Sequence, residues 1–279
     1  ITPHGSRNPE GAFRAPRSAF RNSSAFTLLE LLMVIAIMGI LAAIALPAVR
    51  GLKPNAKVAA TRQLLDAVSR ARQLAMSQRT TVYMVFLPTN FFTSLTGANL
   101  ERVRPLLDKQ LTGYAYVTLR SVGDQPGVHT PRYLSSWRTL PQGAYIPTAK
   151  FNTTETLILT NTDVKPPGMS LTIPAFSFTN NIPFPSEEDP VTVPVWLPYI
   201  AFDPMGALVS GSSQLAGQPE LIPLAEGSVT LARDMESKTA LPLPAAVNEQ
   251  PPGNTIENHS MIYIDRLTGR AHVERRKVQ

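Results

Sequence analysis

One carboxylate, Glu30, stands inside a long apolar stretch. From Leu28 to Leu46 the chain has 19 residues, and Glu30 is the only charged one. As a helix rising about 1.5 Å per residue, this stretch spans roughly 28 Å, close to the thickness of a bilayer core. A charge at the centre of such a segment costs about 2.5–3.5 kcal/mol, and less near its ends. We therefore expect Glu30 to meet a cationic partner.

The remaining ionisable side chains offer weaker chemistry. The run Ser186-Glu187-Glu188-Asp189 could supply oxygen ligands to Ca²⁺, and we interpret it as a solvated acidic loop. The four histidines lack metal-ligand spacing, and the stretch 211–215 misses the G-x-S-x-G nucleophile pattern because it ends in Leu215. The chain has no cysteine, which excludes disulfides and cysteine-based metal sites. We therefore predict no catalytic residue, no metal and no cofactor.

The residues before 81 divide into three predicted segments. Residues 1–25 form a leader with four arginines and one glutamate, residues 26–47 a transmembrane or filament-core helix, and residues 48–80 an amphipathic half-helix. Pro47 predicts a helix kink, and a break is expected within 47–54. The basic flank predicts a single-pass membrane protein, with its N-terminus cytoplasmic and its body periplasmic or otherwise extracytoplasmic.

The amphipathic half-helix carries one apolar stripe. Within residues 55–78, apolar side chains recur every three or four positions, at Leu64, Leu65, Val68, Ala71 and Ala75. The opposite face is polar. Because one face alone is apolar, we expect this helix to lie against a sheet and to have no role in chemistry.

The body, residues 81–279, is predicted to be a β-rich globular domain with long loops. Its many prolines and glycines disfavour a helical bundle. Pro194 and Pro198 make the strand-like run 193–202 an edge strand at best. The predicted class is α+β, with a long N-terminal helix packed on an antiparallel sheet. Residues 88–113 and 121–155 lack clear periodicity and are expected to form long loops or an insertion. Strand patterns occur at 80–87, 114–120, 156–160, 169–173, 193–202, 228–232, 260–264 and 270–274, of which the last two form a hairpin.

The stretch Ala25-Phe26-Thr27-Leu28-Leu29-Glu30-Leu31, with the apolar run and Pro47 behind it, resembles the class III signal of type IV pilins and type II secretion pseudopilins. In that family a dedicated peptidase cuts before the Phe, and the new amine is methylated. The resemblance implies cleavage between Ala25 and Phe26 and N-methylation of Phe26. It also implies subunit assembly, in which Glu30 pairs with the N-terminal amine of a neighbour. Ala25 stands where the family prefers Gly.

The resemblance is closest to the minor pseudopilin H/FimT class. It rests there on the strand that follows at Thr81, on Phe202-Asp203-Pro204-Met205-Gly206 and on the final stretch 263–270. It implies a pilin-like fold and a structural subunit of a type II secretion or type IV pilus-like filament. The implied partners are other pilins or pseudopilins, the prepilin peptidase, the inner-membrane assembly platform and the lipid bilayer. No enzymatic activity is expected.

Alternatives stay open on the sequence. A plain signal-anchor helix would share the hydropathy but has no use for Glu30. A secretory signal peptide would instead be cut after Ala43-Ile44-Ala45. We interpret the basic C-terminal stretch as a solvated strand edge, whose charges prevent unwanted strand pairing. The other reading of this edge is a pilus-associated DNA-uptake minor pilin that contacts phosphates through Arg270, Arg275, Arg276 and Lys277.

Overall fold

The computed structural model describes residues 27–51, 56–120, 123–125, 130–154, 157–159, 171–184, 193–211 and 214–274. They fall in two compact units, Ile1–Lys53 and Pro54–Gln279, which we describe separately. The first unit contains α1 (Leu28–Gly51).

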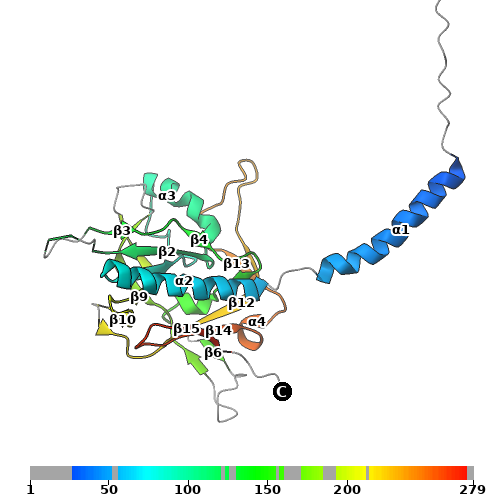
Figure 1. The fold of residues 1–279 in the computed structure, drawn as a ribbon. Helices are drawn as coiled ribbons and strands as arrows, with labels where there is room; N and C mark the ends of the chain where they lie inside the picture. The colour runs from blue at the N-terminus through cyan, green and yellow to red at the C-terminus, as the bar shows by residue number, and fades with distance from the viewer. Residues whose placement is uncertain are drawn as a thin grey trace, which may run out of the picture. The chain divides into compact units, whose positions relative to one another are not determined.

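The second unit is an α+β fold that begins with a helix and continues mainly as antiparallel strands (Figure 1). Its helices are α2 (Ala56–Gln78), α3 (Ala98–Val103), η1 (Arg104–Lys109), η2 (Thr148–Phe151) and α4 (Asn254–Glu257). Its strands are β1 (Val82–Phe86), β2 (Gly113–Thr118), β3 (Arg132–Tyr133), β4 (Arg138–Thr139), β5 (Ala144–Tyr145), β6 (Leu157–Leu159), β7 (Leu171–Ile173), β8 (Ser177–Phe184), β9 (Val193–Phe202), β10 (Leu208–Ser210), β11 (Gln214–Leu215), β12 (Glu220–Thr230), β13 (Ala246–Glu249), β14 (Ser260–Ile264) and β15 (Ala271–Glu274).

The described strands form two main sheets. The first has the order β11-β10-β9-β1-β2-β3, with β4 also paired to β2 and β8 to β9. The second has the order β13-β12-β14-β15, with β5 also paired to β12, and β6 and β7 form a separate pair. All of these pairings are antiparallel. The predicted hairpin near the C-terminus is confirmed as β14 and β15, joined through a turn at 265–269.

Helix α2 lies across both sheets and unites them in one core (Figure 1). Leu64, Val68, Ala71 and Ala75 of the predicted stripe are fully buried, and Leu65 is partly buried. They pack with inward-facing residues of β1, β2, β12 and β14. The prediction that α2 serves as an apolar face against a sheet is therefore confirmed. Small alanines at two of these positions let the helix approach the strands closely.

The face of the first sheet opposite α2 is covered as well, by the segment that follows β1. Strand β1 is buried at all five positions because alternate side chains face two different cores. The second core is filled from residues 88–112, which contribute Phe91, Leu95 and Leu107. Of the two alternatives predicted for 88–113, a long loop or an insertion, the long loop is wrong, since α3 and η1 fold there onto the sheet.

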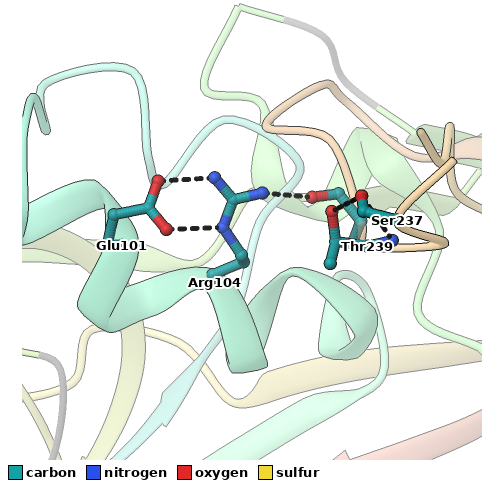
Figure 2. A network of polar contacts seen from close by, with 5 residues as sticks. Glu101, Arg104, Ser237 and Thr239 are labelled. Atoms are coloured by element: carbon teal, nitrogen blue, oxygen red, sulfur yellow. Dashed lines mark hydrogen bonds and ion pairs between the residues drawn. The ribbon is translucent and has the colours of Figure 1, made fainter.

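An arginine fork ties this covering segment to a distant part of the chain. Arg104 donates to both carboxylate oxygens of Glu101, with its Nε 2.8 Å from Oε2, and its Nη1 lies 3.3 Å from the carbonyl oxygen of Ala240 (Figure 2). In the same view Ser237 and Thr239 hydrogen-bond each other through their hydroxyls, 2.7 Å apart. The guanidinium holds the pKa of Glu101 below its usual value, chiefly through the side-chain hydrogen bond.

Strand β9 differs from the expectation of an edge strand. Its residues 199–202 pair with β1 on one side, so this half lies inside the sheet. Residues 193–198 pair with β8 alone among the described strands, whereas Tyr199 lies between β8 and β1. Pro194 and Pro198 both fall in this half, and proline within a sheet is confined to such edge positions because it cannot donate to the ladder. The edge prediction is thus wrong for the C-terminal half of the strand and correct for the half that contains the prolines.

Candidate functional site

The first turn of α1 is closed by a reciprocal capping box between Thr27 and Glu30. The backbone N–H and the hydroxyl of Thr27 each donate to Oε2 of Glu30 at 3.0 Å. In return the backbone N–H of Glu30 donates to the Thr27 hydroxyl at 3.2 Å. This is the S/T-x-x-E pattern that satisfies free N–H groups at a helix start. The spacing of Thr27 and Glu30 in the sequence is enough to predict this box.

The box leaves half of the Glu30 carboxylate open. Both hydrogen bonds from Thr27 end on Oε2, and Oε1 accepts none from any described residue. The rotamer of Glu30 is therefore fixed by its own helix while one oxygen points to solvent. A cation can bind at Oε1 without breaking the cap.

The helix that follows is exposed and apolar on all sides. From Leu28 to Ile40 no described side chain is buried, and Leu28 is 82 % exposed. The other exposed apolar side chains of this segment are Leu29, Leu31, Leu32, Met33, Val34, Ile35, Ile37, Met38 and Ile40. A helix that is apolar all round requires an apolar environment, such as lipid or the core of a bundle. In the residues whose side chains are described, no helix reaches both the length and the hydrophobicity needed to span a bilayer.

The predicted cleavage site and the predicted helix kink are described less fully than Glu30. Ala25 and Phe26 lie outside the described residues. Pro47 lies within α1, of which only the backbone is described at this position, so the kink there stays a prediction.

The two C-terminal motifs singled out in the sequence lie next to each other as a pair of aspartate-capped turns. Asp203 Oδ1 accepts the backbone N–H groups of Met205 and Ala207 at 2.9 and 2.8 Å. Asp265 Oδ1 likewise accepts from Leu267 and Thr268, at 3.1 and 2.7 Å. These hydrogen bonds, led by the one from Thr268, hold the pKa of Asp265 below its usual value.

Arg72 of α2 connects the two turns. Its Nε donates to the carbonyl oxygen of Thr268 at 2.6 Å and to that of Gly206 at 3.2 Å. The backbone N–H of Leu208 also donates to the carbonyl oxygen of Arg266 at 2.9 Å. Arg72 thus fixes helix α2 to both sheets at one point.

Gly269 provides a test of this packing. We expect Gly269→Ala to lower the free energy of unfolding by about 2–3 kcal/mol. The residue has φ +60°, and an added Cβ would collide with the carbonyl oxygen of Gly206 and lie 3.0 Å from the Phe202 ring. The matched control is Gly211→Ala, since Gly211 has φ +58° and open space around it. We expect that control to lose about 1 kcal/mol, from the backbone alone. Urea denaturation measures both, and equal losses would show that the turns separate without cost.

A buried ion pair joins η2 to the start of strand β12 in the second sheet. Lys150 of η2 has no exposed surface, and its Nζ contacts the carboxylate of Glu220 at the start of β12. Nζ also donates to the carbonyl oxygen of Pro174 at 2.7 Å and lies 4.5 Å from the ring centre of Phe176. Burial lowers the pKa of Lys150 and raises that of Glu220, and the attraction between the two charges opposes both shifts.

The basic C-terminal edge is only partly described. Arg270 is exposed, next to β15, whose one described partner strand is β14. Arg275, Arg276 and Lys277 lie outside the described residues. Within the described residues, no group of three or more histidine, aspartate or glutamate side chains gathers as a metal site.

The comparison with protein families bears on the N-terminal site. Residues 20–46 match the family described as "Prokaryotic N-terminal methylation motif". The chain carries a type IV prepilin-like N-terminus. The match includes Phe26, Thr27 and Glu30, so the capping box at the start of α1 lies inside the motif. It supports the pilin and pseudopilin family, with processing by prepilin peptidase and N-terminal methylation. Neither the curated proteins nor the solved structures contain a match to this chain.

Proposed function

We propose that this protein is a minor pseudopilin-like structural subunit of a type II secretion or type IV pilus-like filament, and that it acts by assembly rather than catalysis. The observation that carries the proposal is the methylation motif over residues 20–46 combined with the open Oε1 of Glu30. The motif supplies a processed amine, and Glu30 supplies a pre-oriented acceptor for it. The amine of one subunit and the Glu30 carboxylate of the next have opposite charges and can therefore pair.

The proposed mechanism has three steps. Prepilin peptidase removes residues 1–25, and the amine of Phe26 is methylated. The helix beginning at Leu28 then holds the subunit in the inner membrane, where its exposed apolar side chains contact lipid. During assembly on the inner-membrane platform, Glu30 pairs with the Phe26 amine of an adjacent pilin or pseudopilin, which relieves an unpaired charge in an apolar environment.

The body is proposed to face the periplasm and to remain one rigid element during assembly. Helix α2 and the paired turns tie both sheets together, and the Lys150–Glu220 contact fixes η2 to the second sheet. Assignment to the H/FimT class rests on the resemblance of the motifs that form those turns. The DNA-uptake alternative rests, in the described part of the chain, on exposed Arg270 alone and is the weaker proposal.

The N-terminal residue of the protein recovered from membranes tests this function directly. We expect a chain that starts at N-methyl-Phe26, measured by intact mass and terminal peptide mapping in cells that contain prepilin peptidase. Ala25→Gly is the matched control, because it restores the residue that the family prefers before the cut. A start at Leu46 would mean a secreted soluble domain. If both proteins kept residues 1–25, the assembly mechanism would be excluded.

A further inference from the structure

A groove of about 620 Å³ runs between the polar face of α2 and the strands β2 and β4. Gln63, Asp66 and Arg70 of α2 form one wall. Arg138 forms the other, on the strand whose register places it opposite Tyr114. Volumes of about 300–1,000 Å³ are typical of sites that bind small molecules. No described contact assigns an occupant to this groove.

The floor of the groove is rigid and already hydrogen-bonded. Tyr114 and Tyr116 are 2 % and 0 % exposed. Gln63 Nε2 donates to the Tyr114 hydroxyl at 3.0 Å, and the Tyr116 hydroxyl donates to the carbonyl oxygen of Ala67 at 3.0 Å. Burial raises the pKa of Tyr116, so this hydroxyl stays protonated at neutral pH. The aromatic floor therefore provides shape, and the polar recognition must come from the walls.

The walls carry two arginines with open guanidinium groups. Arg70 and Arg138 are exposed, and neither forms a hydrogen bond or an ion pair with another described residue. Arg104 and Arg233 differ, because each is paired with a carboxylate. Arg70 and Arg138 both lie close enough to Tyr116 for their charges to oppose the rise in its pKa. Two planar forks in one groove match carboxylate or phosphate groups.

The remaining wall residues distinguish between these two anions. Asp66 lies in the same groove, and its carboxylate repels the anionic groups of any occupant, so it favours an occupant whose backbone also carries hydrogen-bond donors, which a phosphodiester backbone lacks. For a polypeptide the same carboxylate is useful, because it can accept a backbone N–H. We propose that this groove binds an extended acidic peptide segment of a partner protein, with Arg70 and Arg138 pairing its carboxylates and Asp66 accepting its backbone N–H. The proposal does not depend on the filament role.

The experiment uses the full chain in detergent and a labelled hexapeptide, Pro-Ser-Glu-Glu-Asp-Pro, in a fluorescence anisotropy titration. This probe copies residues 185–190, the acidic run of the chain itself. We expect it to bind and to weaken as salt increases, whereas the neutral analogue Pro-Ser-Gln-Gln-Asn-Pro does not bind. The double variant Arg70→Ala with Arg138→Ala should weaken binding about tenfold or more. Arg62→Ala, on the same helix but outside the groove, should leave it unchanged.

Several results would overturn the proposal. Absence of binding by the acidic hexapeptide would do so, and so would equal affinity for the neutral analogue. An equal loss with Arg62→Ala would mean attraction to net charge rather than recognition in the groove. A single-stranded oligonucleotide that bound more tightly than the peptide, and depended on Arg70 and Arg138, would make the site one for phosphates. None of these outcomes changes the N-terminal residue found in membranes, so this proposal and the filament role fail separately.

Discussion

Glu30→Gln and Glu30→Leu should both reduce incorporation into filaments by about tenfold or more, while cleavage before Phe26 continues. Close charge pairs at interfaces show coupling energies of about 1.5–7 kcal/mol, and 1.4 kcal/mol corresponds to a factor of ten. The two variants separate the two roles of the residue. Gln can still close a capping box, as Glu does. It has no charge with which to hold a neighbouring amine.

Thr27→Val is the matched control for the cap. It removes the hydroxyl that bonds Glu30 at 3.0 and 3.2 Å but keeps the Glu30 charge and the side-chain shape. Loss of a cap costs about 0.5–2 kcal/mol of local helix stability, and we expect most incorporation to remain. Filament-associated and membrane-associated subunits are quantified by shearing and immunoblotting. Normal incorporation of Glu30→Gln would show that the carboxylate acts only inside its own helix.

Local patterns predicted the elements in which neighbouring residues decide the structure. The stripe of α2 was correct because every third or fourth side chain meets the sheet. Strand β1 and the hairpin of β14 and β15 were predicted from runs of β-formers and from the turn residues between Asp265 and Gly269. The fold class follows from these elements alone.

The central strand β12 was largely missed because its residues are decided by distant partners. Pro223 and Gly227 interrupt the pattern within its eleven residues. Yet Pro223 pairs with Met261, and a Cβ on Gly227 would lie 2.6 Å from the carbonyl oxygen of Asn248. Gly227 is there because a neighbouring backbone approaches closely. A single sequence does not reveal such an approach.

In the candidate site, too, local features could be predicted from the sequence and features formed by distant residues could not. The Phe26, Thr27 and Glu30 spacing is local and was recognised, and the capping box could have been. The groove was not foreseen, because Arg70 and Arg138 are separated along the chain and meet only through the packing of α2 on β2 and β4. The buried ion pair was missed for the same reason. Lys150 lies in a stretch without periodicity, and its partner Glu220 is 70 residues away.

That ion pair should show a large non-additivity in stability. Lys150→Met leaves the Glu220 carboxylate without its partner, and Glu220→Leu leaves a lysine with no exposed surface unpaired. Each single change should lower the free energy of unfolding by about 3–5 kcal/mol, because an uncompensated charge remains buried. The double variant should be more stable than either single one, since two apolar side chains of similar size can pack against Phe176.

The exposed pair of Arg233 and Asp108 is the control for this cycle. Its side chains are 50 % and 48 % exposed, and removing either should cost about 0–1 kcal/mol. Urea denaturation of the four proteins in each cycle gives the coupling energies. If the Lys150 and Glu220 losses simply added, the two groups would not be interacting as charges. Each residue would then stabilise the fold through its other contacts, such as the hydrogen bond from Lys150 to the carbonyl oxygen of Pro174, and not through the charge pair.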